Sequence, residues 1–326
     1  MRAPHLILGV GELLWDMASD SKHGDAAGAH PHGSKGTLGG APANFTVMAG
    51  RLGNHAAILS RIGRDELGSE AVERLNPLPV DTGALQIDTA HATGRATVDL
   101  SHPDARYIIH APVAWDYMQL SDEWVRLAER ADAICFGSLA QRSEQSRQTV
   151  QALAAQTNST CIRVFDVNLR PPFYSEEIVE ESLELATVAK MNEAEAPLIL
   201  DLLGLDAAEP GLERTMTLRF AAERLLEEFP GLALVAITRG SQGSLLATRD
   251  EWNEHPGFPI QVGDSIGAGD AFTAAMTHYL LRGGNLALLN EAGNRWGAWV
   301  ASQSGAMPEL PESVREQVAA EIEGAS

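Results

Sequence analysis

The sequence predicts an α/β protein with a mainly parallel central sheet, helices on both faces of that sheet, and a small β lid. Two observations lead to this fold class. Short apolar runs alternate with helical patterns along most of the 326 residues, which is typical of a parallel sheet covered on both sides. Residues 84–118 interrupt this alternation. A chain of this length that is 44% hydrophobic can bury a sizeable core.

The predicted strands and helices can be placed in order along the chain. The first strand is expected at residues 5–14, followed by a Gly-, His- and Ser-rich loop from Ser19 to Gly36 and by a helical pattern that ends near Leu52. Further strands are predicted from short apolar runs at 56–62, 132–137, 161–167, 232–238 and 244–248. Helices are predicted at 66–75, 121–131, 143–156, 177–188, 213–229, 268–282 and 286–302.

The lid is predicted from segments in which polar and apolar residues alternate. Residues 94–100 and 105–109 both alternate like half-exposed strands. Together with segment 14–38 they could form a small sheet that stands off the main body. The whole chain, 1–326, is therefore interpreted as one domain with lid segments at about 14–38 and 84–118.

Composition excludes several classes of function. The formal net charge of -20 argues against a nucleic-acid or anionic-membrane partner, because both need basic surface. No apolar window of about 18 residues is present, so no membrane span is predicted. The two cysteines, Cys135 and Cys161, lie in apolar runs and are predicted to be buried thiols, which is typical of a cytoplasmic protein.

The strongest local motif runs from Gly263 to Phe272 and leads a glycine-rich turn into a helix. Gly267 and Gly269 let the backbone approach a ligand closely, and the free amides of a helix start favour an anion. Asp270 lies in that first turn. From the residues alone it is either a charge complement to the helix start or a general base that faces a hydroxyl group.

A second motif, residues 39–44, has the sequence Gly-Gly-Ala-Pro-Ala-Asn. Pro42 suits a helix start, and paired glycines permit close contact with a small polar ligand. Asn44 can donate and accept hydrogen bonds, which suits a sugar hydroxyl. A plain turn from strand to helix is the alternative.

Five segments, taken in order, resemble the signatures of the ribokinase-like (PfkB) carbohydrate kinases, whose fold is a three-layer sandwich. They are residues 39–44 (GGAPAN), 61–68 (RIGRDELG), 192–195 (NEAE), 238–244 (TRGSQGS) and 264–270 (DSIGAGD). The resemblance spans nearly the whole chain. Segments 135–142 and 165–171 look most like the fructokinase branch of the family.

The resemblance implies a site for a sugar and for the transferred phosphoryl group. It implies that Asp270 takes the proton from the acceptor hydroxyl while backbone amides form an anion hole. The amides are those of Gly267, Ala268 and Gly269, and the sugar-binding residues are Asp16, Gly39, Gly40, Asn44 and Arg170. For Asp16 the alternative is a turn carboxylate, and for Arg170 the alternatives are a contact with a phosphate or a surface ion pair.

The resemblance also implies sites for ATP and for metal ions. The residues expected to line the nucleotide site are Asn168, Lys190, Asn192, Thr238, Gly240, Gly243 and Asn294. Glu195 is expected to orient Mg²⁺ through water, with an ordinary helix cap as the alternative for this motif. Lys190 could instead be a solvated lysine. A monovalent cation, with K⁺ as the candidate, would bind carbonyl groups of Asp264, Ile266, Val300, Gln303 and Gly305.

Three residues depart from the family pattern. Ser265 stands where threonine is usual, Arg64 stands where Asp or Asn is common, and Glu309 stands where a small hydroxyl residue often closes the cation loop. The hydroxyl group of Ser265 is retained, so little effect is expected there. Glu309 puts the potassium requirement in question.

The function expected from these residues is ATP-dependent phosphorylation of fructose to fructose 6-phosphate. Ribose, 2-keto-3-deoxygluconate, 5-dehydro-2-deoxygluconate and nucleosides are alternative acceptors, and a non-catalytic regulatory protein is a further alternative. An NAD enzyme is disfavoured because the segment from Gly9 to Glu12 (GVGE) lacks the third glycine of the dinucleotide fingerprint. A homodimer formed through the lid is also possible, since exposed strand edges favour pairing.

Overall fold

The computed structural model describes residues 4–17, 36–99, 106–205 and 218–324. Most of the predicted loop from Ser19 to Gly36 lies outside the described residues, and so do residues 213–217 of the predicted helix 213–229.

The body of the molecule is built on one sheet of eight strands, in the order β14-β13-β12-β11-β10-β9-β1-β4. Neighbouring strands run parallel from β12 to β4, whereas β13 pairs antiparallel with both β12 and β14. The strands are β1 (Leu6–Val10), β4 (His55–Leu59), β9 (Ala133–Gly137), β10 (Ile162–Asp166), β11 (Val188–Asn192), β12 (Leu234–Thr238), β13 (Ser244–Ala247) and β14 (Trp252–His255). The predicted mainly parallel sheet is confirmed.

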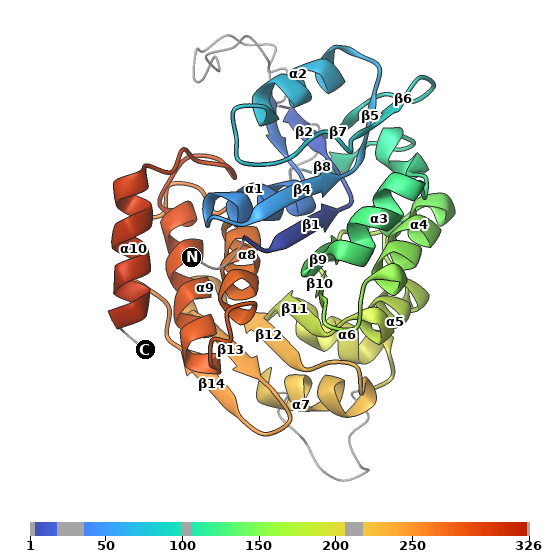
Figure 1. Cartoon of the computed structure of the whole chain (residues 1–326). Helices are drawn as coiled ribbons and strands as arrows, with labels where there is room; N and C mark the ends of the chain where they lie inside the picture. The colour runs from blue at the N-terminus through green and yellow to red at the C-terminus, as the bar shows by residue number, and fades with distance from the viewer. Residues whose placement is uncertain (1–3, 18–35, 100–105, 206–217, 325–326) are drawn as a thin grey trace.

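Helices cover both faces of this sheet, as Figure 1 shows. One layer contains α1 (Ala41–Arg51), α8 (Ala268–Leu280) and α9 (Leu286–Ala301), with α10 (Glu312–Gly324) packed on α9. The other contains α3 (Asp122–Arg130), α4 (Glu144–Gln156), α5 (Glu176–Leu185), α6 (Glu195–Leu202) and α7 (Leu218–Glu228). Successive residues of β1 enter different apolar clusters: Ile7 packs in the cluster with α8 and α9, and Leu8 in the cluster on the opposite face. The fold is the predicted three-layer sandwich.

A separate four-stranded sheet, which we call the lid sheet, has the order β3-β2-β7-β8. Its strands are β2 (Leu14–Met17), β3 (Gly36–Gly39), β7 (Gly94–Asp99) and β8 (Arg106–Ile109). Helix α2 (Glu66–Leu75) packs on this sheet, and the indole of Trp15 donates a hydrogen bond to the carbonyl of Leu67 at 3.0 Å. The predicted small β lid is therefore present.

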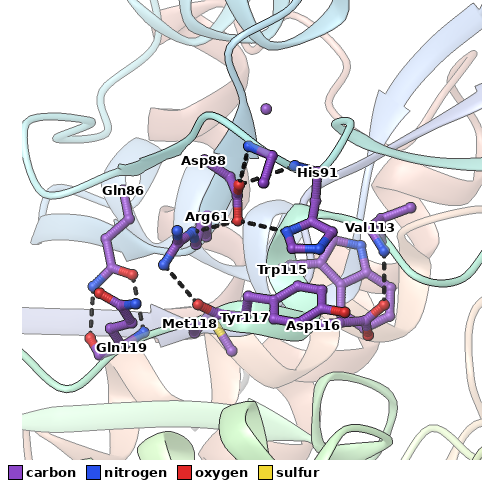
Figure 2. A network of polar contacts seen from close by, with 12 residues as sticks. Arg61, Gln86, Asp88, His91, Val113, Trp115, Asp116, Tyr117, Met118 and Gln119 are labelled. Atoms are coloured by element: carbon purple, nitrogen blue, oxygen red, sulfur yellow. Dashed lines mark hydrogen bonds and ion pairs between the residues drawn. The ribbon is translucent and has the colours of Figure 1, made fainter.

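A polar network surrounds the ion pair of Arg61 and Asp88 (Figure 2). It joins the two-stranded sheet of β5 (Arg61–Gly63) and β6 (Gln86–Asp88) to the short helix η1 (Ala114–Tyr117). Arg61 lies 2.9 Å from the carboxylate of Asp88 and donates to the carbonyl of Tyr117 at 2.7 Å. His91 contacts the same carboxylate at 3.1 Å, and its ring stacks on that of Tyr117 with centroids 3.6 Å apart.

Several predicted boundaries were wrong. The helix predicted at 177–188 ends at Leu185, and β11 begins at Val188 in the middle of the sheet. This strand was missed because Lys190 interrupts its apolar pattern, although the lysine side chain is buried. The strands predicted at 5–14 and 56–62 are each broken in two, and β14 and α10 were not predicted.

Two further observations concern the predicted environment of the chain. Both cysteines are free thiols in buried positions. Among the residues that the structure describes, no helix is both long enough and apolar enough to cross a membrane.

Candidate active site

The glycine-rich turn positions Asp270 at the start of α8. Gly267 caps the helix with φ 79°, a left-handed conformation that glycine adopts without strain. A Cβ atom at Gly267 would lie 2.8 Å from Ala306, so the turn is also too tightly packed for a side chain. The amide of Ala268 donates a long bond of 3.3 Å to the carbonyl of Ser265. Asp270 lies three residues after Gly267, in the first turn of α8.

Asp270 meets a side chain from the other end of the sequence. Asn44, on α1, donates a hydrogen bond from Nδ2 to Oδ2 of Asp270 at 2.7 Å. Burial, together with the nearby charge of Asp166, raises the pKa of Asp270 to about 6. Asp270 nevertheless remains partly exposed. The two motifs that were singled out in the sequence therefore form one site.

The turn before α1 brings the other predicted sugar residues to this place. Gly40 caps α1 with φ 114°, and a Cβ atom there would lie 2.3 Å from the carbonyl oxygen of Glu12. A Cβ atom at Gly39 would lie 3.4 Å from the carboxylate of Asp16, which belongs to β2 of the lid sheet. The lid sheet and the body thus meet at residues 39–44.

Arg170 is exposed on the loop after β10. Its guanidinium donates to the carbonyl of Leu169 at 3.0 Å. Its positive charge lowers the pKa values of Asp270 and Glu12, in opposition to burial. The predicted sugar-binding arginine is therefore near enough to Asp270 and Glu12 to act on both carboxyl groups.

A buried ion pair lies behind the glycine-rich turn. The ammonium group of Lys190 is 3.0 Å from Asp166 and would be 3.0 Å from a Cβ atom at Gly269. The hydroxyl of Thr273 donates to the same carboxylate at 2.9 Å. Burial opposes the lysine charge, but Asp166 and Asp270 outweigh it and raise the pKa of Lys190. The alternative of a solvated lysine is wrong, and the sequence analysis missed Asp166 and Thr273.

Glu195 and Asn192 organise the loops that follow β10 and β11. The two carboxylate oxygens of Glu195 accept from the amides of Leu169 and Asn192, each at 2.8 Å, and burial raises its pKa. The side chain of Asn192 accepts from the amides of Ala194 and Glu195, so the capping alternative also holds. Asn168 lies beside them with φ 42°. No group of three or more His, Cys, Asp or Glu side chains within the described ranges could hold a metal ion.

A cavity of about 190 Å³ opens beside the start of α8. Most of the residues predicted to contact the nucleotide line this cavity, and so do residues of the turn that leads to Asp270. Its lining includes Thr238, Gly240, Gly243, Ala268, Gly269 and Asn294. Asn294 is held by a 2.7 Å hydrogen bond that its amide donates to Ser244. The cavity thus connects the predicted nucleotide residues to the predicted anion hole.

The outer wall of this cavity is fixed by a cluster that the sequence analysis missed. Gly257 and Phe258 line the cavity, and the amide of Gly257 donates to Nδ1 of His255 at 2.9 Å. The other ring nitrogen of His255 lies 2.9 Å from Glu291, and its ring centroid is 5.0 Å from that of Phe258. The guanidinium of Arg295 lies 4.6 Å from the Phe258 centroid.

The residues predicted to bind a monovalent cation lie on two adjacent loops. Asp264 accepts from the amide of Gly305 at 3.3 Å, and a Cβ atom at Gly263 would lie 2.7 Å from the carbonyl of Gln303. The carbonyl of Val300 accepts from the amide of Gln303 at 2.9 Å. Asp264 also accepts from the amide of Ile266 at 3.0 Å.

The three departures from the family pattern lie at the surface. Arg64, Ser265 and Glu309 are all exposed. The neighbouring Asp65 has a structural task, because its carboxylate accepts from the amides of Gly68 and Thr93, each at 2.8 Å. That part of the motif therefore caps α2.

Comparison with known families agrees with this geometry. The model of the pfkB family carbohydrate kinases matches residues 5–313. The chain belongs to this family. It is a sugar kinase with a ribokinase-like fold.

Three relatives illustrate the range of similarity. The uncharacterized sugar kinase PH1459 of Pyrococcus horikoshii is 31% identical over 294 residues, covering 87% of this chain and 85% of the relative. The fructokinase of Klebsiella pneumoniae is 30% identical over 287 residues, with coverages of 84% and 88%. Fructokinase-1 of Zea mays is 28% identical over 322 residues, covering 94% of each chain. The crystal structure of PH1459 in complex with ATP has a TM-score of 0.77 at 28% identity, with 97% of this chain and 99% of that chain covered.

Proposed function

We propose that the chain transfers the γ-phosphoryl group of ATP to fructose to form fructose 6-phosphate, with Asp270 as the general base. One observation carries this proposal. Asp270 lies in the first turn of α8, beside backbone amides that suit a phosphoryl group, and it accepts a 2.7 Å hydrogen bond from Asn44, which follows the turn that suits a sugar.

The chemistry follows from this placement. Above its pKa of about 6, Asp270 is largely ionised and can accept the proton of a sugar hydroxyl. The hydroxyl oxygen forms a bond to the γ-phosphorus while the bond from that phosphorus to the β–γ bridging oxygen breaks. The amides of Gly267, Ala268 and Gly269 stabilise the charge on the transferred group, which is the main task in phosphoryl transfer. Asn44 keeps the base aligned.

ATP would bind along the cavity beside α8, with its phosphates toward Lys190. Thr238, Gly240, Gly243 and Asn294 line this cavity. The buried ammonium of Lys190 adds positive charge below the Gly269 backbone. That the relative PH1459 crystallised in complex with ATP supports the choice of nucleotide.

Mg²⁺ would be held at the phosphates with the help of Glu195. Both oxygens of this carboxylate already accept amide bonds, which leaves lone pairs for water and fits an indirect role. Mg²⁺, when bound, supplies screening of the phosphate charge. Asn168 and Asn192 lie on the same loops. Potassium would be held by the carbonyl groups of the loops at 264–266 and 300–305.

Fructose is favoured by similarity rather than by contacts. Relatives named fructokinase are 28–30% identical over most of the chain, and segments 135–142 and 165–171 look most like that branch. Ribose and the two sugar acids considered above share the hydroxyl groups that Asp16 and Asn44 can bind.

A kinase assay that couples ATP consumption to a sugar panel tests the acceptor. The panel contains fructose, ribose, 2-keto-3-deoxygluconate, 5-dehydro-2-deoxygluconate and adenosine. We expect the largest kcat/KM for fructose. A larger kcat/KM for another sugar would change the proposed acceptor but leave the role of Asp270 as the base in place. Turnover of adenosine without any sugar, or no ATP consumption with any acceptor, would overturn the proposal.

The lid sheet is proposed to close over the sugar. It carries Asp16 to residues 39–44, and closure would keep water from hydrolysing ATP. Hydrogen exchange in segments 14–38 and 84–118 should slow when sugar is added, whereas equal protection would contradict closure. The outer strands of this sheet, β3 and β8, could pair two copies of the chain, and light scattering would measure the resulting dimer.

A further inference from the structure

The segment from Gly9 to Glu12 was singled out in the sequence, but the proposed reaction does not use it. In the structure β1 ends at Val10, and Gly11 then turns the chain with φ 146°. A Cβ atom at Gly11 would lie 2.8 Å from the ring of Pro42, so the turn packs against the start of α1. Glu12 follows, with only 3% of its surface exposed. A carboxyl group is thus buried directly beneath the sugar turn.

Glu12 touches this turn through both its main chain and its side chain. Its Oε1 accepts a hydrogen bond of 3.3 Å from the amide of Ala41, the first residue of α1. Its carbonyl oxygen occupies the space that a side chain at Gly40 would need. Its second carboxyl oxygen, Oε2, is buried and has no hydrogen-bond partner within the described residues.

The surroundings of Glu12 shift the pKa of its carboxyl group in both directions. Burial raises its pKa to about 7, while the main-chain amides of Glu12 itself and of Ala41 and the charge of Arg170 oppose this shift, and Asp270 adds to it. Among the described residues, the charged groups that shift this pKa are Arg170, on the loop after β10, and Asp270, on α8. A buried oxygen without a partner makes the ionised form costly. Below pH 7 the group is therefore mainly neutral.

We propose that Glu12 is a positioning residue of the sugar site, whose neutral carboxyl group holds the turn at residues 39–44 so that Asn44 stays against Asp270. This inference rests on the proposed function. Sugar binding that expels water from the site further favours the neutral form, so binding takes up a proton at Glu12. Sugar affinity then falls as pH rises above 7.

The substitutions Glu12→Gln and Glu12→Ala test the inference, with Glu129→Gln on the exposed surface of α3 as the matched control. Glutamine keeps an acceptor for the Ala41 amide but cannot ionise. We expect the sugar KM of Glu12→Gln to match that of the wild type at pH 6 and to lose its rise above pH 7. Loss of the acceptor in Glu12→Ala should raise the sugar KM about tenfold and leave the ATP KM unchanged.

A pH profile of the sugar KM for Glu12→Gln that coincides with the wild-type profile would overturn the inference. Equal increases of both KM values in Glu12→Ala would do so as well, because a structural defect would affect both substrates. If Glu12→Ala does not fold, the glutamine variant still decides.

Calorimetry gives an independent readout of the same proton. Titration of sugar in the presence of a non-hydrolysable ATP analogue, in two buffers of different ionisation enthalpy at pH 7.5, measures proton uptake. We expect uptake by the wild type and by Asp270→Asn, and its loss in Glu12→Gln. Uptake retained in Glu12→Gln would overturn the inference. A wild type that phosphorylates no sugar would instead refute the proposed function, so the two failures are distinguishable.

Discussion

The phosphate side and the sugar side of the site satisfy their polar groups differently. On the phosphate side Lys190 is paired with Asp166, and Glu195 accepts a backbone amide on each oxygen. On the sugar side Oε2 of Glu12 and Oδ1 of Asn44 are buried without a partner within the described residues. Buried polar groups are normally paired. The phosphate side is therefore organised before any ligand binds, whereas the sugar side keeps unpaired groups near its base.

Replacement of Asp270 by Asn should give the largest effect on activity. The amide has the same shape but cannot accept the proton, so kcat should fall by about 10²- to 10⁴-fold. Steady-state kinetics with the preferred sugar measures this loss. Binding of an ATP analogue should remain within about twofold of wild type, since the cavity beside α8 is untouched. Retention of more than a tenth of the wild-type kcat would contradict the role of Asp270.

Breaking the buried ion pair tests how the phosphate side is organised. Lys190→Met leaves Asp166 buried without its counter-charge, which should lower the free energy of unfolding by about 3–5 kcal/mol. Urea unfolding followed by circular dichroism measures this change. The double variant Lys190→Met with Asp166→Asn should regain much of the stability but not the activity. Recovery of activity in the double variant would show that the lysine acts only through Asp166.

The sugar side should show its unpaired carboxyl group in the pH dependence of stability. Because folding raises the pKa of Glu12 from 4.5 to about 7, its contribution to stability is complete below pH 4.5 and is lost as pH rises through 7. Glu12→Gln has no such loss. It should therefore gain stability over wild type with rising pH, up to about 3 kcal/mol at pH 8.

Urea unfolding at pH 5 and pH 8 measures this gap. Glu129→Gln, which replaces an exposed carboxylate, should show the same difference from wild type at both pH values. A gap for Glu12→Gln that stays constant with pH would mean that the carboxyl group titrates normally in the folded protein.

Local signals decided which parts could be predicted from the sequence. Helix α2 was predicted with its observed bounds because Asp65 caps it and its apolar pattern is regular. Asp270 and Asn44 could be named because each lies in the first turn of a helix, directly after a glycine-rich turn. Strand β11 was not predicted because a lysine interrupts its apolar pattern. Asp166, the partner with which Lys190 is buried, lies 24 positions away.

The residues missed at the site share this property. Glu12 becomes significant only through Ala41, which is 29 positions later. The carboxylate of Asp166 accepts a hydrogen bond from Thr273, which is 107 positions later. No local pattern marks such residues, since their role is created when distant elements pack together.

The wall of the nucleotide cavity offers the smallest and most selective effect. His255→Ala removes the acceptor for the Gly257 amide and the ring that supports Phe258. Loss of about 1 kcal/mol of hydrogen bonding should raise the ATP KM about fivefold, while the sugar KM stays unchanged because the wall does not border residues 39–44. Trp252→Ala, at an exposed position on the same strand, is the matched control and should leave both KM values unaltered. An equal rise of the ATP and sugar KM values in His255→Ala would mean that the two sides of the site are coupled through α9, and the contrast between them would then fail.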